Sequence, residues 1–142
     1  MEIRQCMNKD LVTVNSSSTL QEAAKKMKEK NVGSILVADA GNQLSGILTD
    51  RDIALAITTE GKNAQTPVSE VMKKNPKSID MGQSLDQAFD IMSQHNIRRL
   101  PVVENGKLVG VISSSDLAAT LKKQVEQFIS LEEHYSLSRA GK

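Results

Sequence analysis

The sequence of 142 residues predicts an α/β (α+β) fold in which two copies of one β-α-β-β-α unit pack together. Three observations support this prediction. The chain matches itself after a shift of one repeat length, both halves show strand, helix and turn signals in the same order, and one short motif ends both halves. Because a lone unit leaves one apolar face of its sheet uncovered, we expect the copies to pack sheet to sheet around a pseudo-two-fold axis.

The repeat is visible as matched residues along most of the chain. The shift pairs Met7 with Met72, Lys9 with Lys74, Leu20 with Leu85, Met27 with Met92, Val37 with Val102 and, after one deletion near Ala40, Gly46 with Gly110 and Asp52 with Asp116. We therefore expect a first repeat with an N-terminal cap at residues 1–61, a linker at 62–71, a second repeat at 72–121, and a C-terminal helical extension at 122–142.

Each copy carries the same local signals. A short β-prone run is followed by a helix-capping box, Thr19-x-x-Glu22 in one copy and Ser84-x-x-Gln87 in the other. The following residues have the apolar spacing of a half-buried helix. Two strand-like runs and a polar turn come next, with Asn105-Gly106 as a strong hairpin signal in the second copy. We expect strands at 11–14, 35–38, 44–48, 77–79, 100–103 and 108–112, and a second helix after Thr49 and after Ser113.

Composition excludes several classes of protein. Hydrophobic residues make up 39% and charged residues 25%, which is typical of a globular protein. Aromatic residues are only 2%, so the core must be aliphatic, and aromatic platforms for single-stranded nucleic acid are not expected. The formal net charge of +1 indicates no general surface for nucleic acid or an anionic membrane.

Cysteine and apolar content restrict the chain further. Cys6 is the only cysteine, which excludes an internal disulfide and Cys-rich metal sites. His95 and His134 have no partners at metal-ligand spacing. No apolar stretch approaches the roughly 20 residues of a membrane helix, and the N-terminus has no apolar signal region. We expect a soluble cytoplasmic protein without a metal or redox cofactor and without a membrane partner.

The candidate chemistry lies in a motif of Gly, two apolar residues, a hydroxyl residue, two variable residues and Asp, found at 46–52 and 110–116. Thr49 and Ser113 are expected at helix N-termini, where free N–H groups and the helix dipole favour an anion such as phosphate. Asp52 and Asp116 can accept hydrogen bonds from a ribose diol. The same Ser/Thr-x-x-Asp spacing is also an ordinary capping motif, so spacing alone leaves both interpretations open.

The duplicated motif, with Arg98-Arg99-Leu100-Pro101 ahead of its second copy, resembles the tandem CBS (cystathionine β-synthase) domain pair, or Bateman module. The resemblance covers residues 7 to 121. It implies a non-catalytic regulatory and energy-sensing module that binds an adenine nucleotide (AMP, ADP or ATP) between the repeats. Such a module signals by a change of packing.

The resemblance also implies two clefts, each built from both repeats. One would use Thr49, Arg51 and Asp52 with the backbone at Ile97, Arg98 and Arg99, and the other Ser113, Ser115 and Asp116 with the backbone at Val32, Gly33 and Ser34. In such sites the Asp holds the ribose, hydroxyl residues and arginines hold phosphate, and main-chain groups read the adenine. Because Gly33-Ser34 stand where the second copy has Arg98-Arg99, we expect phosphorylated ligands to favour the Asp52 cleft.

Other functions remain as alternatives. The chain can be a ligand-free interaction scaffold in which the Asp residues only cap helices. Binding of nucleic acid, NAD or S-adenosylmethionine is less favoured, and no catalytic base and nucleophile are recognisable. An apolar stripe of Val125, Phe128, Ile129 and Leu131 in the C-terminal extension predicts a homodimer. An effector protein is also expected, since no second domain is present for the module to control, but the sequence does not identify it.

Overall fold

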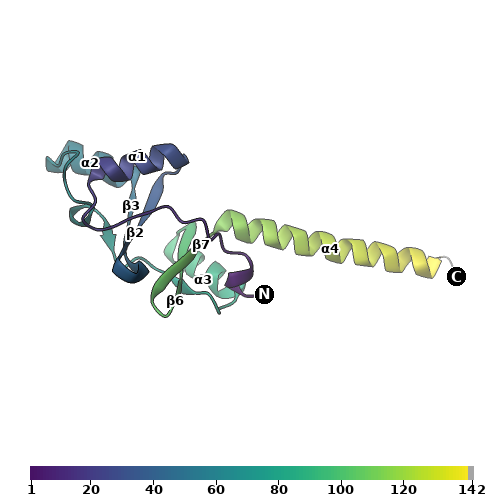
Figure 1. Cartoon of the computed structure of the whole chain (residues 1–142). Helices are drawn as coiled ribbons and strands as arrows, with labels where there is room; N and C mark the ends of the chain where they lie inside the picture. Colours follow the sequence, from purple (N-terminus) through teal and green to yellow (C-terminus); the bar gives the residue numbers. More distant parts are fainter. Residues whose placement is uncertain (141–142) are drawn as a thin grey trace.

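The computed structural model describes residues 1–140, with side chains described through residue 136 (Figure 1). In chain order its elements are η1 (Ile3–Gln5), β1 (Thr13–Val14), α1 (Leu20–Lys30), β2 (Ser34–Asp39), η2 (Ala40–Asn42), β3 (Gln43–Thr49), α2 (Asp50–Glu60), η3 (Val68–Glu70), β4 (Lys73–Lys74), β5 (Ile79–Asp80), α3 (Leu85–His95), β6 (Arg99–Glu104), β7 (Lys107–Ser113) and α4 (Ser114–Ala140). The predicted α/β class and the duplicated β-α-β-β-α order are confirmed.

The two halves have the same strand pairing. In each half a short strand runs parallel to the first strand of a hairpin, β1 beside β2 and β5 beside β6. Both hairpins show a register shift at the same place, after Val37 and after Val102. The two hairpins join through one pair, Gln43 of β3 with Lys107 of β7, which gives the order β1-β2-β3-β7-β6-β5. Figure 1 shows α1 and α2 beyond the strands of one half, and α3 with the start of α4 beside those of the other.

The segment ahead of each repeat packs on the opposite half. Ile3, which is fully buried, lies in the apolar cluster of the second repeat, while Val68 lies in that of the first. Asn8 pairs with Val111, and the equivalent Lys73 pairs with Ile47. The N-terminal cap that the repeat boundaries assign to the first copy therefore contributes its apolar side chain to the core of the second.

Close approach at these crossings explains the matched glycines. A Cβ atom on Gly46 would lie 2.7 Å from the Met72 Sδ and 2.8 Å from the carbonyl oxygen of Lys73. A Cβ atom on Gly110 would meet Met7 in the same way, at 2.8 Å from its Sδ. Only a residue without a side chain lets the crossing segment lie this close to the strand.

Both predicted N-terminal caps are confirmed, but only the second is a complete capping box. Thr19 accepts a hydrogen bond from the Glu22 amide at 3.1 Å without the return bond from the Glu22 side chain. Ser84 and Gln87 form both bonds of the box. The C-terminal extension differs from its prediction, because α4 runs without a break from Ser114 through the expected boundary at 122 to Ala140. Residues 141–142 of that extension lie outside the described residues. No helix in the described part of the chain combines the length and apolarity of a membrane span.

Candidate functional site

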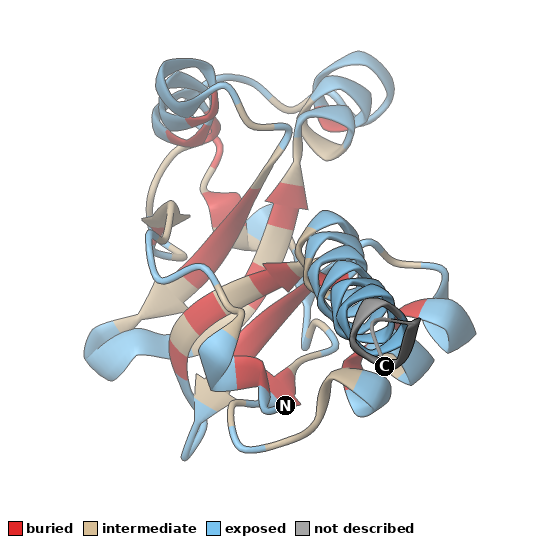
Figure 2. Ribbon diagram, turned by 90° about the vertical axis from the view of Figure 1, so that its right-hand side faces the viewer, coloured by how far each residue is buried: buried red, intermediate tan, exposed pale blue. Residues whose placement is uncertain are grey.

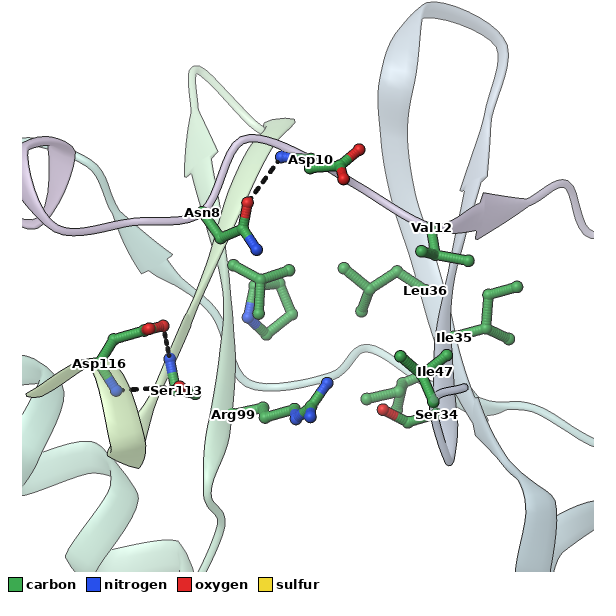
Figure 3. Close-up of a pocket in the computed structure, with 13 residues that line it drawn as sticks. Asn8, Asp10, Val12, Ser34, Ile35, Leu36, Ile47, Arg99, Ser113 and Asp116 are labelled. Atoms are coloured by element: carbon green, nitrogen blue, oxygen red, sulfur yellow. Dashed lines mark hydrogen bonds between the residues drawn. The ribbon is translucent and has the colours of Figure 1, made fainter. Parts of the chain in front are cut away.

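A cleft of about 210 Å³ lies between the two repeats (Figure 3). Three segments build it: the N-terminal segment that crosses to the second repeat, the β2–β3 hairpin together with Val32, and the β6–β7 hairpin with the start of α4. Its lining residues are Asn8, Asp10, Val12, Val32, Ser34, Ile35, Leu36, Ile47, Arg99, Pro101, Val111, Ser113 and Asp116. The cleft has an apolar floor of strand residues and polar groups at its edges.

The start of α4 contributes a reciprocal pair of hydrogen bonds to this cleft. The Ser113 amide donates to Asp116 Oδ2 at 2.9 Å, and the Asp116 amide donates to Ser113 Oγ at 3.1 Å. The capping interpretation of the motif is therefore correct as local structure. It uses only one carboxylate oxygen, since Asp116 Oδ1 accepts no hydrogen bond from the described residues. The same side chain can cap the helix and still accept from a ligand hydroxyl.

The first repeat has the same box at the start of α2. The Thr49 amide donates to Asp52 Oδ2 at 3.1 Å, and the Asp52 amide donates to Thr49 Oγ1 at 3.0 Å. Each helix start is also tied to the strand entry of its own repeat, through Asp50 N to Gly33 O at 3.0 Å and Ser114 N to Arg98 O at 2.8 Å. These two carbonyl oxygens already accept from the protein.

The two helix starts differ in the next amide. In α2 the Arg51 amide donates to Asp50 Oδ1 at 2.8 Å, so a protein carboxylate occupies the place of an anion. In α4 the residue equivalent to Asp50 is Ser114, and the Ser115 amide has no acceptor among the described residues. The first turn of α4 therefore carries one carboxylate fewer than the first turn of α2.

Arg99 lines the cleft described above, which contains Asp116 and is called the Asp116 cleft from here on. The sequence predicts this residue in the cleft of Asp52. Successive side chains of a strand point to opposite faces, and Leu100 is fully buried in the core. Arg99 consequently points away from that core. It pairs with Ser113 across the hairpin and lines the cleft together with Ser34 (Figure 3). The expectation that Arg99 adds its charge to the Asp52 cleft is wrong for this reason.

The remaining predicted residues divide into two groups. Ser113 and Asp116 line the cleft together with Val32 and Ser34, whereas Ser115 and Gly33 of the same expected set do not line it. The residues predicted for the other cleft and found outside this one are Thr49, Arg51, Asp52, Ile97 and Arg98. Thr49 and Asp52 nevertheless occupy the position at α2 that Ser113 and Asp116 occupy at α4.

Sequence reasoning missed the contribution of the N-terminal segment. Asn8 and Asp10 line the cleft, and the Asn8 side chain accepts a hydrogen bond from the Asp10 amide at 2.9 Å. The signal was present in the matched pairs Met7 with Met72 and Gly46 with Gly110, since a glycine is required where another segment crosses a strand. Among the described residues no group of three or more His, Cys, Asp or Glu side chains is placed to hold a metal ion.

Comparisons with known proteins agree with this geometry. The family model described as CBS domain matches residues 3–59 and 68–123. The CBS domain-containing protein YhcV of Bacillus subtilis (strain 168) is 47% identical over 116 residues, which is 82% of each chain. The CBS domain pair of protein MJ0100, in complex with 5′-methylthioadenosine and S-adenosyl-L-methionine, has a TM-score of 0.75 and 26% identity, covering 87% of this chain and 98% of that one.

A further structural relative is an oligomer. The hexameric CBS-CP12 protein from bloom-forming cyanobacteria has a TM-score of 0.68 and 30% identity, over 83% of this chain and 69% of that one. Both repeats of the present chain match the family model, and the duplicated fold and motif agree with that match. The chain therefore belongs to the CBS domain family, as a tandem pair of CBS repeats.

Proposed function

We propose that this CBS pair is a non-catalytic regulatory module that binds an adenine nucleotide between its repeats. The observation that carries the proposal is the Asp116 cleft, where a carboxylate oxygen without a hydrogen bond from the described residues and an arginine lie around an apolar floor. Support also comes from the MJ0100 pair, which binds two adenosine-containing ligands. The module acts in the cytoplasm as a homodimer, and a ligand changes the affinity for an effector protein only if it binds two packing arrangements unequally.

Each polar group of the cleft has one role in this proposal. Asp116 Oδ1 accepts from the ribose hydroxyls, while Arg99 holds the phosphate of AMP, ADP or ATP. The apolar lining, including Pro101 and Leu36, packs against the adenine ring. The Asp52 cleft is the second, weaker site for phosphorylated ligands, because Asp50 already occupies its helix terminus.

Isothermal titration of adenosine and AMP tests the phosphate role with a matched pair of variants. Arg99→Ala removes the arginine that lines the cleft, and Arg98→Ala removes its exposed neighbour, which does not line it. Charged hydrogen bonds contribute about 1.5 to 3 kcal/mol, so Arg99→Ala should weaken AMP binding about ten-fold to a hundred-fold. Adenosine binding should change little in either variant.

The alternative function is a ligand-free scaffold, which the helix-capping role of Asp116 specifically favours. It predicts that adenosine, AMP, ADP, ATP and S-adenosylmethionine all leave the melting temperature of the wild-type chain unchanged. Asp116→Asn separates the two further. In the binding module it lowers ligand affinity by more than it lowers apo stability, whereas in the scaffold only apo stability falls, by about 0.5 to 2 kcal/mol for a weakened cap.

A further inference from the structure

Helix α4 leaves the body of the protein as a projecting rod (Figure 1). Its first turns pack beside α3 and β7, with Leu117 buried in the core of the second repeat. From residue 121 to residue 136 every side chain is exposed, as the pale blue rod in Figure 2 shows. A helical segment of this length is marginally stable alone in water, so its stability depends on contacts that one copy of the chain does not supply.

One face of the rod is apolar. We call the α4 stripe four side chains that share one face of the helix and are 50% to 64% exposed, namely Leu121, Val125, Phe128 and Ile129. The stripe continues into a hollow of about 270 Å³ at the base of the rod, which is lined by Leu121 and by Phe89 of α3, itself 59% exposed. Apolar area thus extends from the body along the rod without interruption.

The charges beside the α4 stripe are distributed unequally along it. Lys122 and Glu126 lie on one edge of the stripe near the body, and Glu133 lies on the same edge, seven residues after Glu126. Glu132 continues the line of the stripe, four residues after Phe128. Within the described residues none of these four charged groups takes part in an ion pair. The edge therefore carries its lysine near the body and glutamates alone toward the far end.

This distribution of charge indicates that a second copy of α4 covers the stripe, and it indicates how the two helices are oriented. A second copy in parallel orientation would place Lys122 beside Lys122 and the glutamates beside the glutamates, which is repulsive. In antiparallel orientation Lys122 of each copy meets Glu133 of the other, with Glu132 close to the same lysine. We propose that the α4 stripes of two copies pack antiparallel, with the two-fold axis near Phe128. The far end of each helix then reaches the hollow beside Phe89 of its partner.

This arrangement gives a specific form to the homodimer of the proposed function, but it does not depend on ligand binding. Its test therefore measures mass in the absence of any nucleotide, and a failure of nucleotide binding leaves it untouched. Sedimentation equilibrium of the full chain at micromolar concentration should give twice the monomer mass of 15.5 kDa. Phe128→Glu should give the monomer mass, with an unchanged urea midpoint for the body.

Two neighbouring lysines provide a matched control for the charge argument. Lys122→Glu and Lys123→Glu change the net charge equally, but Lys123 lies on the face of α4 opposite the stripe. Because two ion pairs per dimer become repulsive, Lys122→Glu should weaken dimerisation about five-fold to thirty-fold. Lys123→Glu should have little effect. The double variant Lys122→Glu with Glu133→Lys should restore wild-type affinity.

Orientation is tested by cross-linking in a Cys6→Ser background. Leu121→Cys copies are about 20 Å apart in the antiparallel pair and should not form a disulfide dimer, whereas a parallel pair would bring them together. A disulfide dimer overturns the antiparallel order. A wild-type chain that remains monomeric shows that another molecule covers the stripe, and a dimer unaffected by Phe128→Glu shows that another face associates; both results overturn the proposal.

Discussion

Helices α2 and α4 begin in the same way and end differently. Both follow a hydroxyl residue and have an Asp that completes the capping box, yet α2 has 11 residues and α4 has 27. Helix α2 ends at Gly61, which has the left-handed φ of 72° typical of a C-terminal cap. The aligned position in the second repeat is Val125, a β-branched residue for which this conformation is strongly unfavourable. The first repeat thus ends its helix on the body, and the second extends it into a rod.

The two repeats share most of their local structure and differ at single positions. The strand pairing, the register shifts and the boxes at Thr49 and Ser113 are common to both. At the helix starts and ends the differences are Asp50 against Ser114 and Gly61 against Val125. Helix α4 begins at the cleft and carries the α4 stripe further along its length, so one element connects the proposed ligand site with the proposed dimer contact.

The largest expected effect concerns the crossed N-terminal segment. Ile3→Ala should destabilise the chain by about 2 to 5 kcal/mol, because it removes a fully buried side chain from the second repeat's core. Hydrogen exchange should increase in β6 and β7 more than in β2 and β3. Ile57→Ala, at a position 44% exposed, serves as the control with a small effect. Increased exchange confined to the first repeat would contradict the crossed packing.

The matched glycines should show the next largest effect. Gly46→Ala places a Cβ atom 2.8 Å from a backbone oxygen, and Gly110→Ala places one 3.0 Å from the equivalent oxygen. Overpacking of this kind costs about 1 to 3 kcal/mol, with Gly46→Ala the more severe. Gly33→Ala is the matched control, because its Cβ would lie 3.4 Å from the nearest atom. Urea unfolding gives the three values, and equal midpoints for all three would refute the close crossing.

The connection through α4 gives a third prediction. If AMP in the Asp116 cleft changes how α4 leaves the body, it also changes the dimer dissociation constant, and by linkage dimerisation changes the AMP affinity of each copy. We expect AMP affinity to change by a factor of about five or more, the lower end of typical allosteric coupling. Titration of wild type against Phe128→Glu measures this factor, and sedimentation with and without AMP measures its square, because the dimer holds one AMP in each copy. The absence of any change in both measurements would separate the ligand site from the dimer.

Local structure was predictable from the sequence, while the direction of crossing segments and of single side chains was less so. Thr19 and Ser84 cap helices as predicted, because capping depends on a few neighbouring residues. The apolar character of Ile3 predicts burial but not which of two similar cores it enters. Arg99 was predictable in principle, since strand alternation opposes it to the buried Leu100. The capture of the Arg51 amide by Asp50 depends on a side-chain rotamer that the pattern does not specify.

The smallest expected effect is a pH dependence of stability that comes from Asp39 at the end of β2 and has no counterpart at the end of β6. Asp39, at the end of β2, accepts hydrogen bonds from the Ser16 amide at 2.9 Å and from the hydroxyls of Ser16 and Ser45. The aligned residue of the second repeat is Glu104, where the aligned neighbours, Met81 and Val109, have no hydroxyl group. The Ser16 amide is the main cause that holds the pKa of Asp39 below its ordinary value of 3.8, and the two hydroxyls lower it further.

The sign of the resulting pH dependence follows from that shift. A carboxylate whose pKa is lower in the folded state stabilises the fold above its unfolded pKa, and the stabilisation is lost as the pH falls toward the folded pKa. Because Asp39 is only half-buried, we expect at most about 1 kcal/mol. Asp39→Asn should lower the urea midpoint at neutral pH and approach wild type below pH 3.8. Glu104→Gln is the matched control in the second repeat, and an equal response of both variants would remove this difference between the repeats.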